Sequence, residues 1–363
     1  MAKKKIAEKA EKEMGSFCTL RNATPKLFES SVSLHRARLI QLLSNKWANG
    51  TVLHYYFFDQ QTDGDNFASW STSDKEKNVV RRAFEKWKDL GIGLEFEEVS
   101  SRTEAEIRIG FLRGDGAWSY IGRDVLDQGA DERTMNFGWD LTAPGEEDTA
   151  LHEIGHTLGF PHEHQNPNAG IVWNEEAVYE ALAKPPNNWD RNTTFHNIIE
   201  KIQADQVQGS KWDPNSIMHY PFEMGLISKP AHYSEGLKPA GGLSARDKTW
   251  IKTFYPPLTN SSYQSLAVAQ SVPLEVKEGG QQNFVIKPLA TRKYDFATFG
   301  KSDSVIVLFE DVNGKLRFRD GDDDSGEDRN ARLSAKLYKG RKYVLRVRVH
   351  YKEQADSVAV MMW

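Results

Sequence analysis

Cysteine is almost absent from this sequence: its 363 residues include a single one, Cys18. One thiol cannot form a disulfide within the chain, so the class of domains held together by a disulfide framework is excluded. The chain is long enough for two domains with substantial hydrophobic cores. It contains 10 Trp, 12 Tyr and 18 Phe residues and is 39% hydrophobic, which indicates a globular protein and not a disordered one.

Long apolar runs are also missing. No stretch of about 18 apolar residues occurs, so we expect no membrane span. The first residues, MAKKKIAEKAEKEMG, carry positive charge, but no apolar stretch follows them as it would in a secretory signal peptide. We therefore expect synthesis in the cytoplasm and, if the protein is secreted, export by another route. The formal net charge of −4 indicates no general attraction to nucleic acid.

Changes in composition divide the chain into three parts. Residues 1–46 form an N-terminal segment that contains one amphipathic run, residues 31–45, with apolar side chains at helical spacing. At Trp47 the sequence becomes rich in β-branched and aromatic residues, and a stretch rich in Pro, Ser and Asn follows Tyr255. We predict domains over residues 47–257 and 258–363.

The first domain has the pattern of an α+β fold, with a mixed sheet and an active-site helix. Residues 50–59, 93–99 and 105–111 are predicted strands. A helix is predicted from Ser73 to Gly91, because Ser73 and Glu76 have the spacing of a capping box and apolar residues then repeat at helical intervals.

The second domain has an all-β pattern. Short β-branched and aromatic runs alternate with turn signals, which predicts a β-sandwich or jelly roll of about 100 residues. The predicted strands are residues 304–310, 315–320, 342–350 and 357–363.

Four of the ten histidines lie within thirteen residues, in the stretch ALHEIGHTLGFPHEH. His152 and His156 are four residues apart, so a helix places both on one face, where each can give a ring nitrogen to Zn²⁺. Glu153, next to His152, suits the role of general base toward a water held at zinc. An ordinary helix with surface histidines is the alternative, but two histidines at this spacing beside a glutamate form a more specific signal than such a helix would give. A closed structural zinc site is a further alternative, but it lacks cysteine ligands and gives Glu153 no role.

Gly159 can adopt positive φ and end this helix in a sharp turn, which would bring His162 back as a third zinc ligand. Three protein ligands leave one position for water, as in catalytic zinc sites and unlike closed structural ones. We expect His164 to orient a neighbouring side chain or to lie in solvent, and not to bind the metal.

The pattern His152-Glu153-x-x-His156-x-x-Gly159-x-x-His162 resembles the metzincin metallopeptidases, and the extended form with Glu163 is similar to the astacin branch. The downstream SIMHY motif, residues 216–220, resembles the astacin Met-turn. The resemblance implies that Met218 forms an apolar floor beneath the metal. It also implies that Tyr220 is an additional, displaceable zinc ligand that helps to stabilise the tetrahedral intermediate.

The resemblance covers about Trp47 to Pro257. Residues 116–124 and 132–139 resemble the segments before the astacin zinc helix, and the second of them is similar to the edge strand that pairs with substrate. Two departures stand out. Ala117 occupies a position where astacins typically have cysteine. The counterpart of Glu163 contacts a newly cut N-terminus in mature astacins, whereas here 46 residues precede Trp47.

Residues 258–363 resemble the bacterial prepeptidase C-terminal type of domain. The acidic run from Asp320 to Asp328 raises the question of Ca²⁺, which carboxylates bind. The run lacks the spacing of an EF-hand loop, and we favour a solvated turn.

The lone thiol lies in the segment that would be an inhibitory propeptide. The aspartate motif of astacin propeptides, Phe-x-Gly-Asp, does not occur in residues 1–46. A thiolate is a good zinc ligand, so Cys18 could take the water position and keep a zymogen inactive. The alternative is that Cys18 is an ordinary small buried residue.

These observations predict a zinc metalloendopeptidase, a hydrolase that cleaves peptide bonds in protein or peptide substrates. The competing hypothesis is a catalytically inactive metallopeptidase fold whose β-sandwich binds a partner or a glycan. The sequence sets neither the cleavage specificity nor the oligomeric state.

Overall fold

The computed structural model describes residues 17–21, 46–47, 49–202, 211–258, 263–276, 280–300, 303–323, 325–326, 330–349 and 358–363. The helix predicted over residues 31–45 lies outside these ranges. The described residues fall into two compact units. The first contains the described part of Met1–Leu27 with His54–Leu90 and Glu98–Thr253, and the second contains that of Phe28–Leu53 with Gly91–Glu97 and Phe254–Trp363. The predicted domain limits at residues 46 and 257 stay a prediction.

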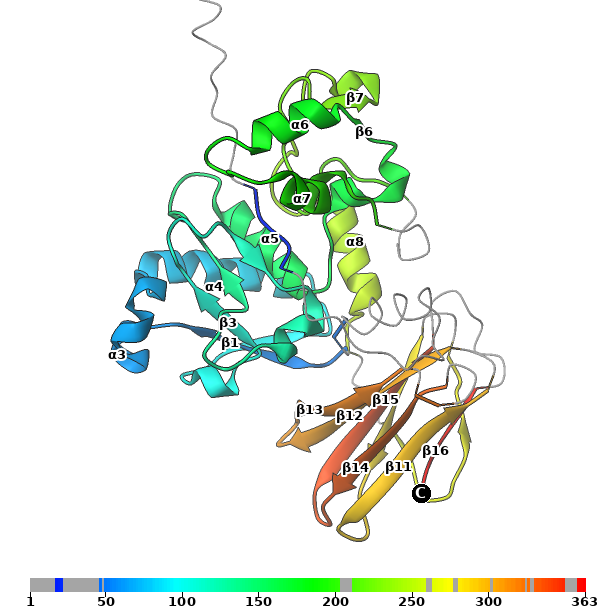
Figure 1. The fold of residues 1–363 in the computed structure, drawn as a ribbon. Helices are drawn as coiled ribbons and strands as arrows, with labels where there is room; N and C mark the ends of the chain where they lie inside the picture. The colour runs from blue at the N-terminus through cyan, green and yellow to red at the C-terminus, as the bar shows by residue number, and fades with distance from the viewer. Residues whose placement is uncertain are drawn as a thin grey trace, which may run out of the picture. The chain divides into compact units, whose positions relative to one another are not determined.

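The first part of the chain is α+β, as predicted (Figure 1). Its strands and principal helices are β1 (Val52–Phe57), α3 (Gln60–Asp63), α4 (Asp74–Lys88), β2 (Glu95–Glu98), β3 (Ile107–Gly110), β4 (Trp118–Ser119), β5 (Met135–Asn136), α5 (Glu147–Thr157), β6 (Val172–Trp173), α6 (Glu175–Leu182), α7 (Arg191–Thr194), β7 (Ile227–Lys229) and α8 (Ala245–Phe254). Short 3-10 helices and one π-helical turn, η6 (Phe195–Ile199), connect them. None of the described helices has the length and hydropathy of a membrane span.

The main sheet of this part has the strand order β2-β1-β3-β5-β4. Strands β1, β3 and β5 run parallel, and β4 pairs antiparallel with β5 at the edge. The prediction that residues 132–139 contain the edge strand is therefore wrong, because β5 lies inside the sheet and β4 covers it. Strands β4 and β5 have two residues each, so their periodicity cannot show which of them lies at the edge of the sheet; only their pairing shows it.

Helices α4 and α5 pack against each other beside this sheet (Figure 1). The ring of Tyr55 in β1 stacks on Phe84 in α4 with centroids 4.4 Å apart. The indole of Trp87, fully buried, donates a hydrogen bond to the carbonyl oxygen of Leu151 in α5 at 3.1 Å. These contacts fix the helix that carries the histidines against the core.

The capping box predicted at the start of α4 does not form. Ser73 occupies the N-cap position, but its side chain makes no capping hydrogen bond. Glu76 instead accepts hydrogen bonds from the backbone N–H of Leu141 at 3.1 Å and from Arg113 at 2.5 Å. The Thr72 hydroxyl, four residues earlier, also donates to this carboxylate, but the long-range partners are ones that sequence spacing cannot show.

The last part of the chain is a β-sandwich, as predicted (Figure 1). One sheet has the order β13-β12-β15-β10-β8 and the other β14-β11-β16-β9. The strands are β8 (Gln264–Ser265), β9 (Val272–Pro273), β10 (Gln281–Ile286), β11 (Arg292–Phe299), β12 (Ser304–Val312), β13 (Lys315–Asp322), β14 (Arg332–Leu337), β15 (Lys342–Val349) and β16 (Ala359–Met362). Their inward side chains, among them Phe284, Phe296 and Tyr343, form one buried cluster.

Candidate metal centre

Helix α5 and the turn after it bring three histidines together, as predicted. His152 and His156 lie one helical turn apart and are both buried. The helix ends in a Schellman motif, with Gly159 at φ 94° and a hydrogen bond from the Phe160 N–H to the Gly155 carbonyl at 3.0 Å. A residue with a Cβ would be strained at this φ, so Gly159 makes the reversal that returns the chain to His162.

Four ligand atoms from distant parts of the chain converge at this point. The Nε2 atom of His156 lies 3.1 Å from Nε2 of His152 and 3.1 Å from Nε2 of His162. The sulfur of Cys18 lies 3.4, 3.4 and 3.1 Å from Nε2 of His152, His156 and His162. Among the residues that the structure describes, this is the one group of three or more His, Cys, Asp or Glu side chains that could hold a metal ion.

The arrangement fits a tetrahedral zinc ion. Zn–N bonds of about 2.05 Å and a Zn–S bond of about 2.3 Å would put the nitrogens about 3.3 Å apart and the sulfur about 3.6 Å from each nitrogen. The Nδ1 atoms of His152 and His156 each contact a carbonyl oxygen, of Ile217 and Phe160 respectively, at 2.7 Å. Each Nδ1 therefore carries the proton, and the Nε2 lone pairs face one another across 3.1 Å. A cation between them removes that repulsion.

Burial keeps these side chains neutral when no cation is present. It lowers the pKa of His152 to about 4 and holds those of His156 and His162 well below the usual range. Burial, and then the Glu153 carboxylate, raise the pKa of the Cys18 thiol. Neutral imidazole is the form that binds metal.

Glu153 points into the same interior, where it interacts with the Cys18 thiol. It is fully buried, and neither carboxylate oxygen makes a geometric hydrogen bond among the described residues. Burial raises its pKa well above the ordinary value for glutamate. A buried carboxylate without such a hydrogen bond is costly unless it serves a bound group, and a water at the metal would provide one.

Met218 packs against the helix that carries two of the histidines, and its implied role as a floor beneath the metal stays a prediction. It is buried against Gly155 of α5, and a Cβ at Gly155 would lie 2.4 Å from the Met218 sulfur. The glycine inside α5 is a poor helix former, and this close approach is the reason for it.

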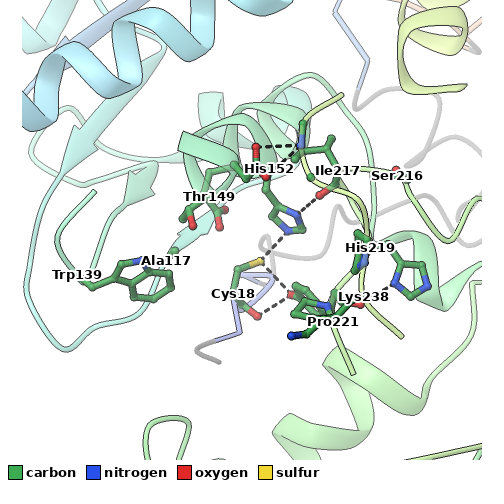
Figure 2. A pocket seen from close by; sticks show the side chains of 16 residues that line it. Cys18, Ala117, Trp139, Thr149, His152, Ser216, Ile217, His219, Pro221 and Lys238 are labelled. Carbon is green, nitrogen blue, oxygen red and sulfur yellow. Dashed lines mark hydrogen bonds between the residues drawn. The ribbon is translucent and has the colours of Figure 1, made fainter. Parts of the chain in front are cut away.

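Asp247, which the sequence analysis did not identify as functional, holds the Met-turn in place. Its carboxylate accepts hydrogen bonds from the Ser216 hydroxyl at 2.7 Å and the Ile217 N–H at 2.8 Å. The carbonyl oxygen of the same residue, Ile217, contacts Nδ1 of His152 and orients its ring (Figure 2). The Ser-x-x-Asp spacing of Ser244 and Asp247 could have identified it, because this spacing is typical of a capping box. The Ser244 N–H donates to the Asp247 carboxylate, and the Asp247 N–H donates to the Ser244 hydroxyl.

Tyr220 lies at the metal group. Its hydroxyl is in contact with Nε2 of His162 and donates to the Cys18 carbonyl oxygen at 2.8 Å. Burial and the neighbouring Cys18 raise the pKa of this phenol well above its usual range. The hydroxyl is thus a neutral donor that can bind a backbone carbonyl oxygen beside the metal ligands, as it binds that of Cys18.

His164 and Glu163 do not join the cluster. His164 is fully buried, so of its two predicted alternatives the one in solvent is wrong; its Nε2 contacts the Asn197 carbonyl oxygen at 2.9 Å, and its ring stacks on His162. Glu163 accepts hydrogen bonds from the Asp213 N–H and the Asn166 side chain, and burial raises its pKa to about 7. No described residue shows the contact with an N-terminus that the resemblance implies for Glu163.

The described segment 17–21, here called the strap, supplies Cys18 to the centre. The Phe17 N–H donates to the Asn187 side chain at 2.9 Å, and the Leu20 N–H donates to the Asn197 side chain at 2.9 Å. Between them the Thr19 N–H donates to the Ala117 carbonyl oxygen, beside strand β4, at 3.2 Å. Figure 2 shows Cys18 extending from this segment toward His152.

Two cavities adjoin the strap. One of about 370 Å³ is lined by the metal-site residues His152 and Glu153, by Ile217 and by Lys238 (Figure 2). The other, of about 1070 Å³, is lined by the strap and by residues 186–197 of the opposite wall. The two cavities that the strap borders are together called the groove, and the metal centre borders the first of them.

The structure does not support a calcium site. The metal-binding group at His152 is the only one of its kind among the described residues. Within the acidic run, Asp320 and Asp322 accept hydrogen bonds from the backbone N–H groups of Gly321 and Ser325, and Asp324 and residues 327–329 lie outside the described residues.

Comparison with known proteins agrees with this geometry. The model of the astacin peptidase family matches residues 39–225, more than half of the chain. Protein SpAN of Strongylocentrotus purpuratus is 31% identical over 155 residues, which are 41% of this chain and 22% of SpAN. Zinc metalloproteinase nas-36 of Haemonchus contortus is 23% identical over 224 residues, 55% of this chain and 32% of that protein. The chain thus spans well under two thirds of either relative.

A solved structure of myroilysin matches with a TM-score of 0.52 and 32% sequence identity, covering 60% of this chain and 98% of that one. The match agrees with the mixed α+β fold of the first part of the chain. The chain belongs to the astacin family of metallopeptidases.

Proposed function

We propose that this protein is a zinc-dependent endopeptidase that Cys18 holds in a latent state. The observation that carries the proposal is the convergence of three buried histidine nitrogens and one thiol, with ligand atoms all within 4.8 Å of one another, beside the buried Glu153, whose oxygens make no geometric hydrogen bond among the described residues. Such a donor set fits zinc, and the buried base beside it suits hydrolysis.

His152, His156 and His162 would hold the zinc ion. When bound, zinc acidifies water and polarises a carbonyl group. Glu153 is placed to accept a proton from that water and to deliver it to the leaving amine. The Tyr220 hydroxyl keeps its proton because its pKa is raised, and it is placed to stabilise negative charge on the carbonyl oxygen of the substrate.

Latency follows from the position of the Cys18 sulfur. It occupies the fourth corner of the donor set, where water would have to sit for catalysis. The strap lies along the groove, and its backbone N–H groups are bound on both sides, so substrate and strap would compete for the same space. Activity requires the strap to leave or to be removed.

The peptidase assignment is tested with zinc-loaded Cys18→Ala protein and unfolded casein. We expect cleavage that a chelator abolishes and added zinc restores. Glu153→Gln in the same background should keep one zinc per chain and lose kcat by about 10² to 10⁴-fold. Casein cleavage by the glutamine variant at the parental rate would contradict the role of Glu153.

Latency is tested by comparing the unchanged chain with Cys18→Ala and with Arg21→Ala, a control that shortens an exposed strap side chain and keeps the thiol. We expect Cys18→Ala to be much more active and Arg21→Ala to stay close to the unchanged chain. Equally low activity in the unchanged chain and Cys18→Ala, both with zinc bound, would refute the switch.

A further inference from the structure

We infer that the pocket filled by Phe17 is a substrate subsite, so that this enzyme cleaves proteins beside an aromatic residue. The inference rests on the proposed peptidase function and names the side chain that the groove selects. It starts from what the strap places in the groove on either side of the metal ligand.

The Phe17 side chain is enclosed by aromatic rings. It is 5% exposed and meets the Tyr220 ring edge-on, with centroids 4.8 Å apart and planes at 87°. Phe222 and Trp189 complete the wall, at centroid distances of 5.8 and 6.2 Å. Edge-to-face and tilted contacts of this kind favour an aromatic ring over an aliphatic chain of similar size.

The strap backbone is held by acceptors that any peptide could use. The side-chain oxygens of Asn187 and Asn197 and the carbonyl oxygen of Ala117 each accept a backbone N–H. The Asn197 amide is fixed with its oxygen toward the groove, because its Nδ2 donates to the Thr193 carbonyl at 2.9 Å. These contacts bind the backbone of an extended chain and do not select its side chains.

The pocket lies one residue from the reacting position. Phe17 immediately precedes Cys18, whose sulfur and carbonyl oxygen contact His162 and Tyr220. A substrate held by the same backbone acceptors would place its scissile peptide group at Cys18 and a flanking side chain in the Phe17 pocket. The groove therefore contains an apolar pocket, lined by aromatic rings, next to the peptide bond that would be cleaved.

The other end of the strap offers little selectivity. The Arg21 side chain is 42% exposed, and its guanidinium lies 4.2 Å from the centroid of the Trp118 ring. Its ion-pair partner Asp115 is also paired with Arg133 at 3.1 Å. An exposed ion pair with a carboxylate that already has a cation discriminates weakly. Selection by the strap-binding groove is thus concentrated at the aromatic pocket.

The first experiment digests a mixture of random-sequence peptides with zinc-loaded full-length Cys18→Ala protein and maps the cut sites by mass spectrometry. We expect Phe, Tyr and Trp to be enriched over Ala by at least about tenfold at one of the two positions flanking the cut bond. Trp189→Ala in this background should bring the enrichment below about threefold, whereas Trp363→Ala, which removes a tryptophan from the β-sandwich, should not.

A second measurement does not depend on turnover. Full-length protein carrying Phe17→Ala, Cys18→Ala and Glu153→Gln, loaded with zinc, is titrated with the peptides Ser-Phe-Ala-Thr-Leu-Arg and Ser-Ala-Ala-Thr-Leu-Arg. We expect the phenylalanine peptide to bind at least about tenfold more tightly.

Each outcome decides one of the two claims. Cleavage without aromatic enrichment, enrichment that Trp189→Ala leaves unchanged, or equal binding of the two peptides would overturn the subsite. Preferential binding of the phenylalanine peptide with no cleavage by any zinc-loaded variant would uphold the subsite and refute the peptidase function.

Discussion

A Cβ atom on Gly155 would lie 2.4 Å from the sulfur of Met218. The contact joins the middle of the histidine helix to the turn beneath it, and real Cβ atoms do not approach a neighbour so closely. The histidines of α5 and the Met-turn therefore keep their spacing only while residue 155 has no side chain.

We expect Gly155→Ala to lower the free energy of unfolding by about 1–3 kcal/mol, because overpacking forces the helix or the methionine to move. Zinc content should fall with it. Denaturant titration and metal analysis measure both effects. The matched control is Gly129→Ala, an exposed glycine where an added Cβ would meet Glu132 at an ordinary 3.8 Å; a smaller effect at Gly155 than at Gly129 would contradict the packing argument.

Asp247 offers a test of indirect control over the metal. Alanine leaves the Ile217 and Ser244 N–H groups without an acceptor, which we expect to cost about 3 kcal/mol of stability. Zinc affinity should drop by about 10 to 100-fold, because the turn that orients His152 loosens. Asparagine keeps one acceptor oxygen for these two donors, so Asp247→Asn should recover most of both losses, and failure to do so would weaken the assignment.

The same carboxyl gives a pH dependence with a definite sign. Burial raises the pKa of Asp247 above the ordinary 3.8, so just above that pH the folded state keeps a proton that the unfolded state has lost. Its contribution to the free energy of unfolding must then decrease as the pH rises through this interval. The difference in urea midpoint between the parent and Asp247→Asn, followed from about pH 3 upward, isolates the contribution; a difference that moves in favour of the parent as the pH rises would show that the pKa is lowered.

Removal of the metal should destabilise the first unit. Zinc that binds the folded state alone adds about 4 kcal/mol when its concentration is about a thousand times the dissociation constant. We expect a chelator to lower the melting temperature and zinc to restore it. His162→Ala, which lacks one ligand, should show little response to the chelator, and a full response in that variant would place the metal elsewhere.

Tyr220→Phe separates the two roles of the phenol. Without the hydroxyl, the Cys18→Ala enzyme should lose kcat by about 10²-fold while KM for a peptide changes little, since the donor acts on charge that develops during reaction. In the otherwise unchanged chain, the loss of the bond to the Cys18 carbonyl should loosen the strap and raise the rate at which the thiol reacts with an alkylating reagent. An unchanged kcat would contradict the catalytic role.

Much of this centre could be predicted because its parts are local. The spacing of His152, His156, Gly159 and His162 is set by one helix and one turn, and those geometries follow from the chain itself. Four strands of the sandwich, β12, β13, β15 and β16, could be predicted for the same reason, since alternation along a strand needs no distant partner, whereas β8, β9, β10, β11 and β14 were missed.

The errors and omissions concern long-range partners. Glu76 does not form the predicted cap, because its carboxylate binds Leu141 and Arg113 instead. The order of β4 and β5 in the sheet is set by their pairing with other strands, which their own sequences do not show. Asn187 and Asn197 lie in segments without periodicity, and their function is visible only because another segment donates to them.

The strap and the metal ligands belong to one chain, and this sets how the proposed latent state would respond to protein concentration. Displacement of Cys18 is an intramolecular equilibrium, so dilution cannot release it, and an external inhibitor or substrate must compete with a tethered ligand at an effective concentration on the order of millimolar. If Cys18 holds the enzyme latent as proposed, the degree of latency would be the same at every protein concentration, and cutting the tether or consuming the thiol would end it.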